Sequence, residues 1–108
     1  MNKRDLQRAK NDNARRLEHT SKIHRNCIRI NTGNTYAHEL KKFEVCWALA
    51  KDGKEYITEA VVEGTKRRYD IFVLDTGEII EIETNPKIIS EKSKGENVTY
   101  IRPSGVDG

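Results

Sequence analysis

Long apolar stretches, proline and cysteine are all scarce in this chain of 108 residues. Hydrophobic residues make up 35% of the chain, and no apolar run approaches the ~20 residues that a membrane-spanning helix needs. The basic N-terminus is not followed by an apolar stretch, so it does not predict a secretory signal. The two cysteines, Cys27 and Cys46, fit an intracellular protein better than a disulfide scaffold. We therefore expect a cytoplasmic protein without a membrane partner.

Several catalytic and metal-binding signatures are missing as well. The sequence contains neither a phosphate-binding Gly-x-x-x-x-Gly-Lys-Ser/Thr loop nor a Gly-x-Ser-x-Gly nucleophile turn. His19, His24 and Cys27 lack a convincing fourth ligand for zinc. A chain of this length builds only a thin core, and pairing into a homodimer is a reasonable way to gain stability.

Positive charge is concentrated at one end of the chain. Residues 1–30 hold nine Lys or Arg against three Asp or Glu, a net charge of +6, whereas the remaining 78 residues carry eleven against fourteen, a net charge of −3. Residues 3–18 are rich in helix formers but lack an apolar stripe, so we expect a helix that orders only on a partner. A basic arm on an acidic body suits nucleic acid, bound mainly through its phosphates, and a solvated tail is the alternative. The arginines of this arm that we expect to bind nucleic acid are Arg4, Arg8, Arg15 and Arg16.

The periodicity after residue 34 predicts one long helix. Asn34 or Thr35 can cap it, Asp52-Gly53 ends it, and apolar residues recur at steps of four and three, as in a helix that packs on a sheet. We expect this stripe, including its aromatic residues, to lie in the core. Its members are Tyr36, Leu40, Phe43, Trp47 and Ala50, widened by Val45, Cys46 and Leu49.

Strand patterns follow the helix and give the order α-β-β-β-α-β. We expect strands over Glu55–Glu63, Arg67–Leu74 and Glu78–Thr84, a short helix from Pro86 to about residue 95, and a fourth strand over Val98–Ile101. This order predicts an α/β fold with a mixed central sheet and helices on its faces. We divide the chain into a basic arm and connector (1–34), a core (35–102) and a flexible tail (103–108).

The turn between the second and third predicted strands brings three carboxylates together. If Thr76-Gly77 is a two-residue loop, Asp70 lies opposite Glu83, and Glu81 shares their face because residues two apart on a strand point the same way. The carboxylates would repel one another, and bound Mg²⁺ or Mn²⁺ would relieve that repulsion. The alternative is an ordinary half-exposed hairpin. The opposite face would collect the apolar residues Ile71, Val73, Ile80 and Ile82.

The segment from Arg67 to Glu83 resembles the core of the PD-(D/E)XK nuclease superfamily, with small archaeal Holliday-junction resolvases the most similar in size and style. Asp70 and Glu81 match the two acidic positions of the motif, and Tyr69 stands in place of its proline. The resemblance implies a restriction-endonuclease-like fold over residues 35–102. It also implies hydrolysis of DNA, including branched or junction DNA, with Mg²⁺ or Mn²⁺ held by Asp70, Glu81 and Glu83.

The third motif departs from the family because Glu83 stands where lysine is usual. The resemblance then implies that Glu83 binds metal or activates water, that Lys87 supplies a migrated lysine, and that Glu39 on the first helix assists the metal. His38, beside Glu39, is either a surface residue or a member of the site. The basic residues just before Asp70 are expected to hold a substrate phosphate; these are Lys66, Arg67 and Arg68.

The same departure supports a different function. A catalytically inactive nuclease-like module would bind nucleic acid, DNA more than RNA, or a protein partner without cutting. A small accessory protein whose acidic face holds no metal is the third alternative.

Overall fold

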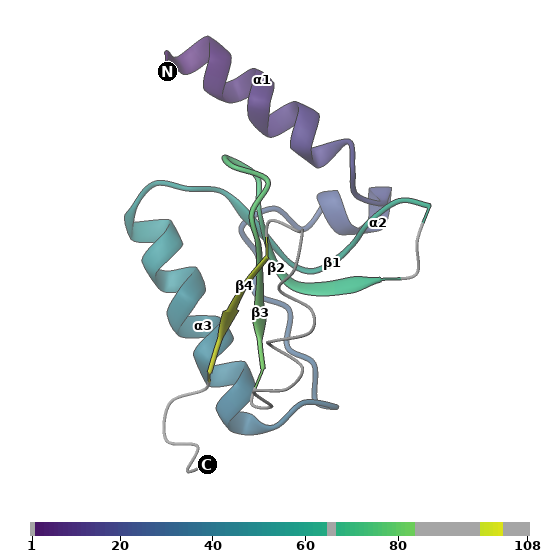
Figure 1. The fold of residues 1–108 in the computed structure, drawn as a ribbon, viewed down its shortest axis with the longest axis vertical. Helices are drawn as coiled ribbons and strands as arrows, with labels where there is room; N and C mark the ends of the chain where they lie inside the picture. The colour runs from purple at the N-terminus through teal and green to yellow at the C-terminus, as the bar shows by residue number, and fades with distance from the viewer. Residues whose placement is uncertain (1, 65–66, 84–97, 103–108) are drawn as a thin grey trace.

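The computed structural model describes residues 2–64, 67–83 and 98–102. In this part of the chain the elements are three helices and four strands (Figure 1). The helices are α1 (Lys3–Ala14), α2 (His19–Lys22) and α3 (Tyr36–Lys51), and the strands are β1 (Tyr56–Val61), β2 (Arg68–Val73), β3 (Ile79–Ile82) and β4 (Val98–Ile101). The predicted helix from Pro86 to about residue 95 lies outside the described residues.

The four strands form one mixed sheet in the order β1-β2-β3-β4. β1 pairs with β2 and β2 with β3 in antiparallel fashion, whereas β3 and β4 run parallel. A meander followed by a parallel return is the topology that the strand pattern predicted. The coarse prediction of an α/β fold with a mixed sheet is therefore confirmed.

Helix α3 begins and ends where the sequence predicts. The Thr35 hydroxyl accepts a hydrogen bond from the His38 amide at 3.2 Å, which satisfies one of the unpaired amides of the first turn. Gly53 follows the last turn with a φ of 73°, a conformation that glycine adopts without strain.

The face that α3 turns toward the sheet is only part of the predicted stripe. Tyr36 is 83% exposed and Trp47 59% exposed, so the expectation that the aromatic stripe lies in the core is wrong. The sheet is covered by the residues that widened the predicted stripe, Cys46 with Val45 and Leu49 beside it, which confirms that part of the prediction. The physical reason is that carboxylates of the sheet require charged partners, and Lys42 and His38 of α3 supply these partners between the helix and the sheet.

Two apolar clusters fill the two faces of the sheet. The α3-side core consists of the buried residues Cys46, Tyr56, Ile71, Val73, Ile80 and Ile82. The arm-side core lies on the other face and consists of Ala14, Leu17, Ile57, Ala60, Phe72, Leu74 and Ile79. The four apolar residues predicted to share a face are together in the α3-side core, which confirms that part of the pattern; they are Ile71, Val73, Ile80 and Ile82.

Cys46 lies fully buried in the α3-side core, and both cysteines are free thiols. Burial raises the pKa of the Cys46 thiol to about 12, although the nearby Lys42 ammonium opposes the shift. The expectation that Cys46 packs in the core is therefore confirmed, and its raised pKa makes the thiol poorly reactive.

The basic N-terminal segment is built onto the rest of the chain. The Asn13 side-chain amide donates to the Leu74 carbonyl at 2.6 Å, and the Lys10 ammonium lies 3.3 Å from Glu55 and 3.7 Å from Asp75. Ala14 and Leu17 belong to the arm-side core. Figure 1 shows α1 at the end of the molecule where the β2–β3 turn lies. These contacts order the helix within the chain itself, so a partner is not required for its formation.

The described residues contain no helix both long enough and apolar enough to span a membrane.

Candidate functional site

The β2–β3 turn decides which carboxylates meet. The Val73 amide donates to the Glu78 carbonyl at 2.8 Å and the Gly77 amide donates to the Val73 carbonyl at 2.8 Å, so the turn holds four residues, Leu74–Gly77. Gly77 has a positive φ of 76°, as predicted, but the two-residue loop is wrong. The longer turn forms because the Asp75 carboxylate accepts from the Glu55 amide at 2.7 Å, which holds Asp75 outside the ladder.

The observed pairing is displaced by two residues from the predicted one. Ile71 lies opposite Ile80, and continuing this register puts Asp70 opposite Glu81 instead of Glu83. The Glu83 amide bonds to the Ile101 carbonyl at 3.0 Å, on the side of β4. The prediction that Asp70 and Glu83 form a cross-strand pair is therefore wrong, whereas the approach of Asp70 and Glu81 is found.

Asp70 and Glu81 join the two strands through their side chains. The Asp70 amide donates to Glu81 Oε2 at 3.1 Å, and the Ile82 amide donates to Asp70 Oδ2 at 2.8 Å. These bonds stand beyond the last Ile71–Ile80 pair, where main-chain bonds would otherwise continue the ladder. The two carboxylates are therefore fixed on neighbouring strands by bonds from main-chain amides.

The Asp70 side chain does not point to the predicted face of the sheet. The regular alternation of side chains between the two faces is interrupted in the row that contains Glu59 and Asp70. Glu59 lies in the β1 row opposite Asp70 and has a φ of 51°, a left-handed conformation that is costly for a residue with a Cβ. Glu59 contacts Lys42 of α3, whereas the adjacent Thr58 bonds to Cys27 and Arg29 of the connector. Asp70 likewise shares the α3 side with Ile71, so the expectation that they lie on opposite faces is wrong.

On the α3 side, Asp70 belongs to a chain of five ionisable side chains. His38 Nε2 lies 3.3 Å from Asp70 Oδ2, and His38 Nδ1 lies 2.9 Å from Glu39 Oε2. The Lys42 ammonium continues the chain, at 2.8 Å from Glu39 Oε1 and 3.1 Å from Glu59 Oε1. We call Asp70, His38, Glu39, Lys42 and Glu59 the charged network.

Lys42 is the most buried member of the charged network. Its side chain is fully inaccessible, and its ammonium donates to the Arg29 carbonyl at 2.7 Å as well as to Glu39 and Glu59. Its three donors therefore have three acceptors, the condition under which a buried charge is tolerated. Sequence reasoning missed both Lys42 and Glu59. The available signal was spacing, because Lys42 follows His38 by four and Glu39 by three and so shares their helix face.

Glu39 is ionised at neutral pH. Burial alone would raise its pKa, but hydrogen bonds from the Asn31 amide, Lys42 and His38 outweigh burial and bring the pKa down to about 2. Both ring nitrogens of His38 face carboxylate oxygens, and only the protonated ring donates from both. The charged network thus sets three carboxylates against one ammonium and one imidazole.

A depression of about 300 Å³ opens beside the network. His38 and Glu83 form part of its wall, so the site is reachable from solvent on this side. The remaining wall residues come from the N-terminal approach to α3 and the end of β3; they are Gly33, Asn34, Thr35 and Ile82.

The predicted basic contacts are spread over both ends of the hairpin. Arg4 and Arg8 are exposed on α1, whereas Arg67 and Arg68 are exposed at the start of β2, close to Asp70 in sequence. Lys66 and Lys87 lie outside the described residues. Two other arginines of the arm already have partners in the fold: Arg15 lies 3.5 Å from Asp12, and the Arg16 guanidinium lies 5.4 Å from the centre of the Phe72 ring.

The number of ligand side chains limits which metal site the described residues can form. Within residues 2–64, 67–83 and 98–102, no group of three or more His, Cys, Asp or Glu side chains is placed to hold a metal ion. Mg²⁺ in nucleotide and phosphate sites commonly takes only one or two protein carboxylates and completes its shell with water and substrate oxygens. Asp70 and Glu81 fit that smaller donor set.

Comparisons of the chain with protein-family models, with curated proteins and with solved structures found no match.

Proposed function

We propose that this protein is a metal-dependent endonuclease that hydrolyses DNA phosphodiester bonds, with Mg²⁺ or Mn²⁺ held by Asp70 and Glu81. The observation that carries the proposal is the pair of bonds at the end of the β2–β3 ladder, in which the carboxylates of Asp70 and Glu81 each accept from a main-chain amide of the facing strand. Two hard oxygen donors on adjacent strands are what a divalent ion bound together with a phosphate requires.

The side chains around the two carboxylates have distinct tasks in this proposal. The bonds from the Ile82 amide and His38 hold Asp70 in one orientation, so little reorganisation is needed when substrate binds. A bound ion would polarise the phosphodiester and lower the pKa of the attacking water. Glu83 and His38 line the depression, and in this proposal Glu83 would accept a proton from that water and His38 would give one to the leaving oxygen.

The substrate would be gripped through its backbone. Arg67 and Arg68 precede Asp70, and the exposed arginines of α1 lie at the turn end of the hairpin. Gly77 and Glu81 are four steps apart in the chain, which is about 13 Å of extended backbone. That is about four base pairs of duplex DNA at 3.4 Å per pair, so one substrate can contact both ends of the hairpin.

The experiment compares cleavage by the wild-type chain and Asp70→Asn on duplex, single-stranded and branched DNA, with Mg²⁺, Mn²⁺ or chelator. We expect metal-dependent cleavage that falls by a factor of about 10²–10⁴ in Asp70→Asn, with binding retained in fluorescence anisotropy. Asp52→Asn is the matched control, because Asp52 is exposed at the end of α3 and should leave cleavage unchanged. Equal cleavage by Asp70→Asn would contradict the assignment.

A second candidate is a non-catalytic module that binds nucleic acid. The observation in its favour is that Asp70 and Glu39 are already engaged by amides, His38 and Lys42 within the fold, while Glu83 stands in place of the family's lysine. This candidate predicts binding that weakens steeply with salt and no cleavage with either ion.

A further inference from the structure

The outward face of α3 carries an exposed row of large apolar side chains. Tyr36 is 83% exposed, Trp47 59%, Phe43 47% and Leu40 40%. The Phe43 and Trp47 rings lie 6.3 Å apart and are tilted by 34°, so they form one continuous surface. We call Tyr36, Leu40, Phe43, Trp47 and the small Ala50 the outer seam of α3. Contiguous exposed apolar surface of this kind marks an interaction site in soluble proteins.

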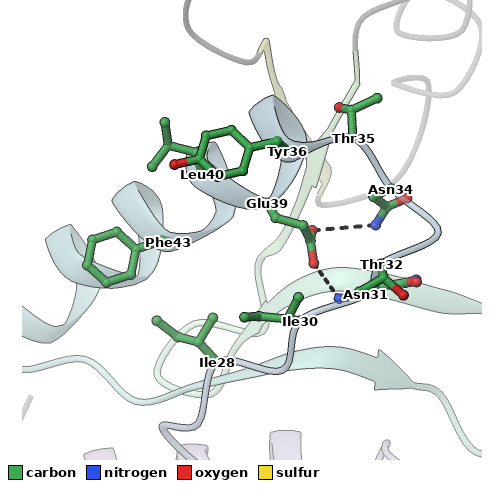
Figure 2. Close-up of a pocket in the computed structure, with 10 residues that line it drawn as sticks. All are labelled: Ile28, Ile30, Asn31, Thr32, Asn34, Thr35, Tyr36, Glu39, Leu40 and Phe43. Carbon is green, nitrogen blue, oxygen red and sulfur yellow. Dashed lines mark hydrogen bonds between the residues drawn. The ribbon is translucent and has the colours of Figure 1, made fainter.

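A groove runs along this seam. It has a volume of about 520 Å³, and Leu40 and Phe43 form one wall while Ile28 and Ile30 of the preceding connector form the other (Figure 2). Ile30 is itself 74% exposed. The groove gives the seam a concave border into which a large side chain from another molecule can insert.

Spacing and charge indicate what kind of partner fits. The seam residues recur at steps of four, three, four and three, which is the repeat by which one helix packs along another. The seam residues carry no charge, the Glu39 carboxylate that lines the groove is engaged by the Asn31 amide and Lys42, and the neighbouring Lys41 is paired with Glu44 at 2.8 Å. An uncharged helical stripe suits another apolar helix and does not suit a polyanion.

The exposed area matches what a dimer needs. With about 150–250 Å² for each aromatic side chain, the exposed fractions of the seam and Ile30 leave on the order of 600 Å² of apolar surface per copy. Two copies would together bury about 1,200 Å², the lower end of the range for specific protein interfaces.

We propose that the occupant of this face is a second copy of the chain, with the two α3 helices packed antiparallel about Phe43. Large residues then meet smaller ones, because Trp47 lies opposite Leu40 of the partner subunit and Tyr36 opposite Ala50 of the partner subunit. A parallel pair would instead set each aromatic residue against its own copy and leave Ala50 as a gap. The inference is independent of the proposed nuclease function.

The test is the oligomeric state of the whole chain in solution, measured by sedimentation velocity from about 1 to 100 µM. We expect a reversible dimer, and we expect Phe43→Glu to raise its dissociation constant by about 30-fold or more, as for residues central to an interface. Ile23→Glu is the matched control, because Ile23 is as exposed as Trp47 but lies away from α3. Circular dichroism checks that both variants keep the fold.

Trp47 provides an independent readout because it is the only tryptophan of the chain. Dilution of the wild-type chain through the dimer transition should shift Trp47 emission to the red, as the indole becomes exposed to water. A chain that stays monomeric throughout the range, or a Phe43→Glu variant that pairs as well as wild type, would overturn the proposal. Quenching of Trp47 in a monomeric chain by single-stranded DNA would overturn it in favour of base stacking.

Discussion

The two sides of α3 reverse the usual arrangement of a helix on a sheet, in which the apolar side faces inward and the charged side faces solvent. Its inward side places the fully buried Lys42 and the ionised Glu39 next to the sheet, whereas its outward side exposes Tyr36, Phe43 and Trp47 to solvent. A helix with an apolar stripe normally turns that stripe to the core. The comparison shows that periodicity locates a stripe on a helix without saying which side of the helix is inside.

The reason lies in what each side meets. The inward side faces two carboxylates of the sheet, Glu59 and Asp70, and a buried carboxylate needs a cation and hydrogen bonds. Lys42 and His38 supply them, and Val45, Cys46 and Leu49 supply the apolar contacts around them. The aromatic residues lie on the remaining part of the helix surface and therefore face solvent.

Removing the central cation should have the largest effect on the inward side. Lys42→Met would leave Glu39 and Glu59 buried without their shared partner, and we expect a loss of about 3–5 kcal/mol in the free energy of unfolding. Urea denaturation followed by circular dichroism measures it. Lys41→Met is the control on the same helix, because the Lys41–Glu44 pair reaches solvent through the exposed Glu44 and is worth about 1 kcal/mol or less. Equal losses in the two variants would erase the contrast between the two sides.

Lowering the pH should have the next largest effect on the stability of the inward side. The pKa of Glu39 falls from 4.5 to about 2 on folding, so its ionised form stabilises the protein above pH 4.5 and this contribution is lost as the pH falls toward 2. A shift of this size corresponds to about 3 kcal/mol. We expect Glu39→Gln to lose less unfolding free energy than wild type between about pH 5 and pH 2.5. Parallel pH profiles for the two proteins would mean that Glu39 is not held as described.

The same leucine-to-alanine substitution on each side of α3 should give the smallest change in unfolding free energy and the most direct comparison of the two sides. Leu49→Ala removes packing from the α3-side core and should cost about 2 kcal/mol, whereas Leu40→Ala, at a 40% exposed position, should cost less than about 0.5 kcal/mol in dilute, monomeric protein. Chemical denaturation at low protein concentration compares them. A larger cost for Leu40→Ala would place the outer seam inside the monomer.

The local elements were predictable from sequence, and their relative placement was not. Thr35 and Asp52-Gly53 delimit α3, and the strand β4 begins and ends at the predicted residues. These boundaries depend on caps, turns and β-branched runs, which are local signals. The register of β2 against β3 depends on a turn that Asp75 holds open through a bond to Glu55, twenty residues away.

The candidate site shows the same division. The approach of Asp70 to Glu81 was predicted, although through the wrong register. The turn of Asp70 toward α3 follows from the left-handed backbone of Glu59, and nothing in a single sequence marks a glutamate for that conformation. Lys42 was overlooked because a lysine in a helix is ordinarily solvated, and its burial depends on the Glu59 carboxylate of β1 and the Arg29 carbonyl of the connector.

Lys42 and the Asp70 contact lie on the sheet side of α3 and the outer seam on its solvent side, with Glu39 bordering both the network and the groove, so an α3-to-α3 dimer would be arranged back to back. The two Asp70 carboxylates would stand on the far sides of two packed helices, separated by roughly 20 Å or more at about 10 Å per helix. Neither copy could then lend a residue to the other's site. Such a dimer would present two complete, independent sites facing away from each other, suited to acting on two separate stretches of ligand.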